Sequence, residues 1–297
     1  MKLRDVFIAL VAVLILGTSF VAVKLAVREI PPLLLSSLRF FFAAIPAIFF
    51  VKRPEVPVRF VVSFGLTMGA VQFALLYTAI KLGMPAGLSS VVVVQMQVFF
   101  TVLLAYICFG EKPLPLEIAG GLVALVGVAL IGVLENSAVE PVLFALVSAS
   151  ALAWAAASII TKAARPSDTF AFVVWSCPVS PLPLLVLSLL VEGRAPVMAA
   201  LLHPSLVSIG AVAFLAYATT LGALALWVKL LSRYPAGAVA PFGLLVPVFG
   251  ILSTHLLLGE EMTRIEIAGS GLVLAGLILT VSAASFGGLR RRVWARP

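Results

Sequence analysis

Long apolar runs separated by short polar breaks fill almost the whole chain. Each run is close to the ~20 residues that a helix needs to cross the hydrocarbon core of a bilayer. Ten such runs are found, at 6–27, 33–51, 60–80, 86–108, 114–134, 141–161, 169–191, 205–228, 235–258 and 267–286. The pattern predicts an all-α integral membrane protein with ten transmembrane helices, and no soluble domain fits in the residues that remain.

The composition agrees with this prediction. Of 297 residues, 63% are hydrophobic and 11% are charged, far from the balance that a soluble domain carries on its surface. The sequence has two cysteines, which are too few for a disulfide framework.

The basic residues indicate how the chain is oriented in the membrane. The net charge of +8 is compatible with a nucleic-acid partner, but its distribution argues against one. With ten crossings, fourteen basic residues lie on the side that holds both termini and four on the other, while Lys24 and Arg39 lie within helices. The positive-inside rule therefore predicts a multi-pass protein with both termini in the cytoplasm.

One short segment occurs twice. "GEKPLPLEIAG" at 110–120 returns as "GEEMTRIEIAG" at 259–269, with six of eleven positions identical, and "MPAG" at 84–87 faces "YPAG" at 234–237. The spacing is about half the chain, so each repeat holds five helices. Because five is odd, the second copy starts on the opposite side of the membrane. We therefore predict two inverted five-helix repeats, at 1–136 and 137–297.

An inverted repeat is typical of transporters that work by alternating access around a site near the membrane midplane. The carboxylates inside the repeated segment are interpreted as structural. Glu117 and Glu266 fall in the first turn of the following helix, and Glu111 and Glu260 lie at the headgroup boundary. The other reading, a role in coupling, is weaker because neither pair lies near mid-bilayer.

Several longer segments carry a family resemblance. These are "PPLLLSSLRFFFAAIPAIFFVKRPEVP", "LGMPAGLSSVVVVQMQVFFTVLLAYICFGE", "FVVWS" and "VAPFGLLVPVFG". Together with the "GE" that ends the fourth and ninth helices, they resemble the EamA group of the drug/metabolite transporter superfamily along essentially the whole chain. The resemblance implies a bacterial inner-membrane exporter of small amino-acid metabolites such as O-acetylserine and cysteine. Related subfamilies handle aromatic amino acids and paraquat-like drugs.

Polar residues at mid-depth are the candidates for a substrate site. The three glutamines, Gln72, Gln95 and Gln97, fall near the centres of predicted helices, where an amide must find partners in the bundle or a cavity. Gln95 and Gln97 point about 200° apart on a helix, so both cannot face one cavity unless the helix is locally unwound. Bonding between helices is an equal alternative for each glutamine. Gln72 and Gln95 are the better candidates.

The other candidates are amphipathic or basic. Aromatic residues with a polar atom suit a pocket for amphipathic solutes, although ordinary packing is the alternative for each one. Lys24 is a candidate for a substrate carboxylate or a positive rim, with snorkelling to the interface as its alternative, and Arg39 is left open between these roles. The predicted substrate-binding residues are Gln72, Gln95, Lys24, Tyr77, Ser19, Trp154, Trp175, Tyr217 and Thr220.

Prolines and small residues suggest where helices bend and where they touch. Proline removes a backbone donor, so Pro241 and Pro247 in the ninth run are candidates for a hinge between states. Small residues four apart allow close backbone contact, and they occur at Gly120/Ala124 and Gly271/Ala275.

Other function classes fit the sequence less well. An intramembrane enzyme needs paired carboxylates, a nucleophile or metal ligands within the bilayer, and the sequence offers no such set there. The sequence has no ring of carboxylates or filter-like segment as expected of a channel, and it has no sizeable extramembrane surface as expected of a receptor. We expect no cofactor and no metal. Proton antiport, exchange and facilitated export stay open, as does the oligomeric state, and the expected partners are an amino-acid substrate and membrane lipid.

Overall fold

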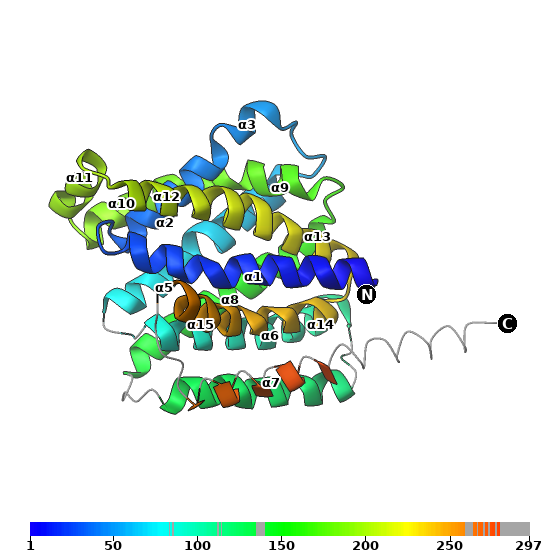
Figure 1. The fold of residues 1–297 in the computed structure, drawn as a ribbon. Coiled ribbons are helices and arrows are strands. Elements are labelled where there is room, and N and C mark those ends of the chain that lie inside the picture. Colours follow the sequence, from blue (N-terminus) through cyan, green and yellow to red (C-terminus); the bar gives the residue numbers. More distant parts are fainter. Residues whose placement is uncertain are drawn as a thin grey trace.

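The chain folds into a bundle of helices that run roughly side by side (Figure 1). The computed structural model describes residues 1–82, 84, 86–111, 113, 115–134, 140–258, 264–265, 267–269, 271–272, 274–276 and 278–279. Every regular element in this part of the chain is a helix.

The first half of the chain contains spans that are interrupted in two places. Its elements are α1 (Leu3–Ala26), α2 (Pro32–Ala44), α3 (Ala47–Phe50), α4 (Val58–Phe64), η1 (Gly65–Val71), α5 (Gln72–Lys81), α6 (Ala86–Phe109) and α7 (Pro115–Leu134). The predicted second run is divided between α2 and α3. The third run is one continuous helix whose centre, η1, is π-helical.

The second half repeats this organisation. Its elements are α8 (Pro141–Ala164), α9 (Thr169–Ser176), η2 (Cys177–Val179), α10 (Pro181–Val191), α11 (Arg194–Leu202), α12 (Leu206–Ala213), η3 (Phe214–Leu224), α13 (Ala225–Arg233), α14 (Ala236–Val239), η4 (Ala240–Leu244) and α15 (Leu245–Leu258). The seventh run is broken by the 3₁₀ turn η2, and the eighth has the π-helical centre η3.

Most of the predicted spans are long enough to cross a membrane. By length and composition seven described helices qualify: Leu3–Ala26, Pro32–Phe50, Val58–Ala79, Val92–Phe109, Pro141–Ala164, Thr169–Val191 and Leu206–Arg233. Three shorter apolar helices lie at Ile118–Gly127, Pro241–Leu257 and Ile267–Gly276. The chain is therefore a multi-pass membrane protein, while the count of ten crossings stays a prediction.

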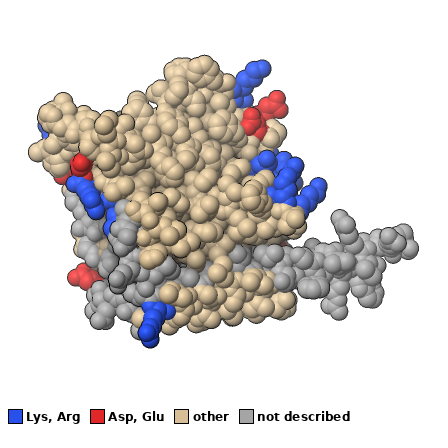
Figure 2. Space-filling view, viewed as in Figure 1, with Lys and Arg blue, Asp and Glu red and all other residues tan. Residues whose placement is uncertain are grey.

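The outer surface is that of a protein in lipid. Large apolar side chains such as Phe50, Leu190 and Leu206 are 84%, 77% and 87% exposed. On the face that Figure 2 shows, charged side chains gather toward the two ends of the helices and leave a broad uncharged band between them. Such a band suits the hydrocarbon core, where exposed charges are costly.

The two halves contact each other in a reciprocal way. In the predicted repeat, spans one to five correspond to spans six to ten. Span one (α1) packs along span nine (α15), and span six (α8) packs along span four (α6). Span two (α2) contacts η3 of span eight, and span seven (α9) contacts α4 of span three. Each of these contacts has its counterpart when the halves are exchanged.

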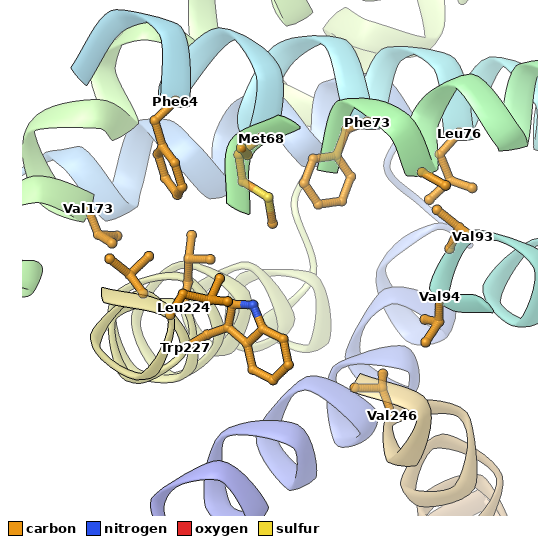
Figure 3. Packing of buried hydrophobic residues seen from close by; sticks show 14 of the residues in the cluster. Phe64, Met68, Phe73, Leu76, Val93, Val94, Val173, Leu224, Trp227 and Val246 are labelled. Atoms are coloured by element: carbon orange, nitrogen blue, oxygen red, sulfur yellow. The ribbon is translucent and has the colours of Figure 1, made fainter. Parts of the chain in front are cut away.

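Apolar side chains from both halves fill the centre of the bundle. Figure 3 shows Phe64, Met68 and Phe73 of the third span facing a region that Leu224 and Trp227 of the eighth span approach from the other side. All five side chains are buried. The core is thus shared between the halves.

Two glycines allow helices to pack so closely that an added Cβ atom would clash with the neighbouring helix. A Cβ added to Gly17 of α1 would lie 2.5 Å from Cβ of Phe249 in α15 and 2.9 Å from the backbone nitrogen of Gly250. A Cβ added to Gly276 would lie 2.5 Å from the backbone nitrogen of Ala124 in α7. The predicted small residues of α7, Gly120 and Ala124, are therefore in close contact with a second segment. The residue of that segment in contact is Gly276 and not the predicted Gly271, because a Cβ at Gly271 would meet nothing within 4 Å.

Candidate substrate site

Arg39 of α2 and Thr220 of η3 form a buried hydrogen bond between the two halves. Nε of Arg39 donates to Oγ1 of Thr220 over 2.7 Å. The Thr220 hydroxyl in turn donates to the backbone carbonyl of Leu215 over 2.8 Å, five residues back in the π-helical turn. Arg39 is 8% exposed and Thr220 is 0% exposed. Thr220 was a sequence candidate, and Arg39 was left open.

Aromatic rings surround the Arg39 guanidinium. Its Cζ atom lies 5.1 Å from the ring centroid of Phe73 and 5.5 Å from that of Phe40. Phe73 packs edge-on against Phe40 at 5.7 Å and against Tyr77 at 5.4 Å, measured between centroids. The candidate Tyr77 is buried in this group. Helices α2 and α5 thereby form an aromatic wall beside the charge.

The charge of Arg39 is poorly compensated. Within the described part of the chain, no carboxylate pairs with it and its two Nη nitrogens have no hydrogen-bond partner. A desolvated cation–π contact contributes about 2 kcal/mol, whereas burying an ion costs several kcal/mol. An ionisable side chain held inside a membrane bundle at such a cost indicates a functional site.

Gln72 is a second polar group at the joint between the halves. It follows η1 directly, is 3% exposed, and its backbone carbonyl accepts a 2.9 Å hydrogen bond from the Ser150 hydroxyl of α8. Its side-chain Oε1 is buried and has no hydrogen-bond partner among the described residues. An unsatisfied buried acceptor costs about 1–3 kcal/mol, so this amide is available to a donor group.

A third polar group lies where α6, α13 and η4 meet. Gln97 is 1% exposed, and its Nε2 donates to Oγ1 of Thr101 over 2.9 Å. Its Oε1 and the buried Nε1 of Trp227 have no partner within the described ranges. A Cβ added to Gly243 would lie 3.8 Å from that Oε1 and 3.6 Å from the Trp227 ring, so the groups are close.

Two sequence candidates have their polar atoms engaged in bonds that hold the fold. Nε1 of Trp175 in α9 donates to the backbone carbonyl of Val51 over 3.0 Å, which ties the seventh span to the end of α3. The Ser19 hydroxyl donates to the carbonyl of Leu16 over 2.5 Å, within its own helix. These bonds give both side chains a structural contact, and their predicted roles in substrate binding stay predictions.

Three other candidates lie apart from the Arg39 cluster, and one cannot be placed. Lys24 is exposed in the last turn of α1. Tyr217 is 44% exposed and lines the cavity between α2, α11 and α12. Trp154 is half-buried against the hydrophobic core. The backbone of Gln95 belongs to α6, but its side chain lies outside the described residues. The binding roles of all nine candidates stay predictions.

The two hinge candidates differ in their setting. Pro241 opens the 3₁₀ segment η4, which separates α14 from α15. Pro247 lies in the first turn of α15, where backbone N–H groups have no partner within the helix in any case. The interruption of the ninth span is therefore at Pro241, while its action as a hinge is still a prediction.

Cavities of very different size accompany this arrangement in the described part of the chain. One of about 460 Å³ lies between α6, α7 and η4, where apolar side chains line it, and one of about 360 Å³ lies between α2, α11 and α12. Both are lined by residues of the two halves. A third cavity between the halves, beside Phe40, Gly69 and Cys177, has about 10 Å³. That is room for about one water molecule. A solute larger than water therefore fits beside Phe40 only when the halves move apart there, and a substrate-binding role for any of these cavities stays a prediction.

Comparison with known proteins shows the family. The sequence profile described as "EamA-like transporter family" matches residues 3–133 and again residues 142–282. The chain belongs to the EamA-like transporter family. As a member it is 40% identical over 288 residues to a protein of Salmonella typhimurium named "Probable amino-acid metabolite efflux pump", covering 95% of this chain and 96% of the relative.

Further relatives agree with this membership. A protein of Escherichia coli (strain K12) with the same printed name is 38% identical over 287 residues, covering 95% of this EamA-like chain and 96% of the relative. A solved crystal structure superposes with a TM-score of 0.74 at 19% identity, over 96% of this chain and 99% of that one. At this identity the likeness shows the fold alone.

The sequence pattern did not reveal the aromatic residues that this EamA-like chain places beside Arg39 and Gln97. Phe40 and Phe73 carry no polar signal, and nothing in the pattern distinguishes them from lipid-facing phenylalanines. Trp227 was not singled out, although it is a tryptophan in a predicted span, as the chosen Trp154 and Trp175 are. Arg39 carried a signal, because it is one of two basic residues inside the predicted helices.

Proposed function

We propose that the protein exports small amino acids and related metabolites across the bacterial inner membrane. The observation that carries this proposal is the similarity, over 95% of the chain, to two proteins named as probable amino-acid metabolite efflux pumps. Cysteine, O-acetylserine, threonine, methionine and aromatic amino acids are the expected substrate range. The chain acts as a transporter and not as an enzyme.

The proposed architecture is ten spans in two inverted five-helix repeats, 1–136 and 137–297. The double match of the family profile and the reciprocal contacts between halves support it. In such a repeat each half leans against the other, so one central site opens to either side in turn. Pro241 is proposed as the point where the ninth span flexes.

The proposed orientation places both termini in the cytoplasm, as the basic residues indicate. Proton antiport, exchange and facilitated export are all compatible with this orientation. We expect membrane lipid as the surrounding partner and no nucleic-acid partner.

The proposed site lies at the joint of the halves. Gln72, Tyr77 and Thr220 are the sequence candidates nearest to this joint, and their burial at helices from both halves supports the assignment. An exporter of dicationic drugs is the alternative within the same fold. The unpaired charge of Arg39 argues against it, because a buried cation repels a cationic substrate.

Transport by the purified protein in liposomes tests this proposal. Counterflow of cysteine, O-acetylserine, threonine, methionine and aromatic amino acids is measured with and without a pH gradient, and paraquat serves as the cationic comparison. We expect at least one amino acid to move faster than in empty vesicles, with paraquat at the background rate. Amino-acid rates equal to those of empty vesicles contradict the proposal. Acceleration by the pH gradient identifies proton coupling.

A further inference from the structure

We propose that the guanidinium of Arg39 binds the carboxylate of the transported solute and that Thr220 positions it for this task. The inference rests on the proposed transport function and deepens it by assigning the recognised group. Arg39 is 8% exposed, and its Nη nitrogens have no partner among the described residues. A guanidinium presents its donors in a planar fork that matches the two oxygens of a carboxylate.

The hydrogen bond to Thr220 determines which edge of the fork is available. Thr220 has one hydroxyl hydrogen, and it is donated to the carbonyl of Leu215. The Thr220 oxygen therefore acts as an acceptor toward Arg39, and it engages Nε at 2.7 Å. The end of the guanidinium that carries Nη1 and Nη2 is left for a ligand, and this end makes two parallel hydrogen bonds to a carboxylate.

The aromatic neighbours favour the same role. Phe40 and Phe73 lie beside the guanidinium at 5.5 and 5.1 Å, and Arg39 is only 8% exposed. In such a low-dielectric setting an ion pair with a ligand is stronger than in water. A carboxylate is therefore the group that gains most from this site, and a solute without one gains little.

The site also connects binding with the movement of the halves. Arg39 comes from α2 of the first half, and Thr220 comes from η3 of the second. Separating the halves lengthens the bond between them and releases the Arg39 side chain. A carboxylate arriving in the opened joint then binds the Nη1/Nη2 end of Arg39, and closure restores the bond between Nε and Thr220 with the solute enclosed.

Thermal melting of the purified full-length protein tests the inference directly. The panel contains cysteine, O-acetylserine, threonine and methionine, each beside its methyl ester, and N-acetylserine as a carboxylate without an ammonium group. We expect carboxylates to raise the melting temperature, while esters need roughly tenfold or more higher concentration for the same shift. Arg39→Met abolishes this discrimination, and Arg39→Lys and Thr220→Val weaken it.

Arg59→Met is the matched control. Arg59 is an exposed arginine that stacks on Phe60 at 5.1 Å, so its removal deletes a similar side chain and ring contact away from the site. We expect it to behave as the wild type. Without ligand, Arg39→Met should melt at or above the wild-type temperature, because Thr220 keeps its bond to Leu215 and an unpaired charge is removed.

The outcomes separate this inference from the proposed function. Carboxylate discrimination that survives in both Arg39→Met and Arg39→Lys, or that is absent from the wild type, overturns the inference even when amino acids are transported. Discrimination that is lost with Arg39 while no amino acid moves in liposomes supports the inference and contradicts amino-acid export. If Arg39→Met does not fold, Arg39→Lys and Thr220→Val decide.

Discussion

The ammonium nitrogen of Lys162 lies 2.6 Å from Oε1 of Glu111, at the end where α6 and α8 finish. The same nitrogen donates to the backbone carbonyl of Tyr234 over 3.3 Å, and the Tyr234 hydroxyl donates to Oδ2 of Asp5 over 2.6 Å. Ends of α1, α6, α8 and α13 are thus joined by one set of polar contacts. The first "GE" therefore supplies a carboxylate, that of Glu111, which ties its span to the other half.

Glu111→Gln should destabilise the protein by about 1–2 kcal/mol. The side chains of Lys162 and Glu111 are 13% and 27% exposed, between an open surface pair worth about 0–1 kcal/mol and a buried one whose disruption costs about 3–5 kcal/mol. Thermal melting of Glu111→Gln, Lys162→Met and the double variant gives the coupling energy. A coupling energy near zero would mean that the pair does not stabilise the fold.

Glu192 should act as the N-terminal cap of α2 from the opposite half. Its Oε1 accepts from the backbone N–H of Leu33 at 2.8 Å and its Oε2 from that of Leu34 at 3.2 Å, while α2 has no side-chain cap of its own. Removing a cap costs about 1 kcal/mol, and a carboxylate also favours the positive helix end. We expect Glu192→Ala to lower the melting temperature, and Glu192→Gln to lower it less.

Glu140→Ala is the control for this comparison. Glu140 lies at the N-terminus of α8, just as Glu192 lies at the N-terminus of α2. Unlike that of Glu192, the side chain of Glu140 makes no capping hydrogen bond. It should leave the melting temperature unchanged. Equal losses for the two alanine variants would show that the Glu192 bonds contribute nothing specific.

Glu29 should make stability depend on pH in the acid range. Hydrogen bonds from Ser205 and Ser208 lower its pKa below the ordinary 4.5, and the Ser208 hydroxyl donates to Oε2 over 2.7 Å. A lowered folded pKa stabilises the protein above the unfolded pKa, and this contribution is lost as the pH falls through the folded pKa. The wild type should therefore exceed Glu29→Gln in melting temperature at neutral pH, and the difference should shrink as the pH falls below the ordinary pKa of 4.5 and vanish below the lowered folded pKa.

Melting curves at several pH values check this expectation, and Glu55→Gln serves as the comparison because Glu55 is an exposed loop residue. A difference between wild type and Glu29→Gln that stays constant from neutral to acid pH would exclude Glu29 as its source.

The length and apolarity of the runs were enough to predict the helices, because lipid leaves the backbone no other partner than itself. The facing of side chains was harder to predict. Tyr217 and Thr220 were both chosen as polar or amphipathic residues at mid-depth of the eighth run, and at three residues apart they would share one face of an α-helix. In the structure η3 is π-helical, and Thr220 is buried whereas Tyr217 is 44% exposed. Sequence periodicity assumes the α-helical turn and cannot anticipate this change.

Partners from distant spans set the second limit. Trp175 is the kind of amphipathic residue that lines pockets, so the sequence favoured a binding role. Its Nε1 instead donates to the carbonyl of Val51, a partner that only the fold brings near. The depth of Arg39 in the membrane could be predicted from the sequence. The absence of a carboxylate partner among the described residues could not, because it depends on which helices pack around Arg39. Residues of the second "GE" segment, including Glu260 and Glu266, lie outside the described residues, so their predicted structural role stays a prediction.

Gly17→Ala should destabilise the joint between α1 and α15. The added Cβ would lie 2.5 Å from Cβ of Phe249, closer than carbon atoms approach, so the two helices must separate. Overpacking of this kind costs about 1–3 kcal/mol. Gly121→Ala and Gly210→Ala are the controls, because a Cβ at either glycine meets nothing within 4 Å. Melting temperatures that fall equally in all three variants would point to a general effect of the substitution.

Pro241→Ala should slow transport without weakening solute binding. Pro241 is buried at the start of η4, where a 3₁₀ turn interrupts the ninth span, and alanine restores the backbone donor that a continuous α-helix needs. A stiffer span makes the movement between states costlier, while Arg39 and Thr220 keep their positions. We expect a several-fold lower counterflow rate with an unchanged melting response to carboxylates.

Pro247→Ala is the matched variant, because Pro247 lies in the first turn of α15 and should affect the rate less. Equal rates for Pro241→Ala and the wild type would place the flexing point elsewhere in the span.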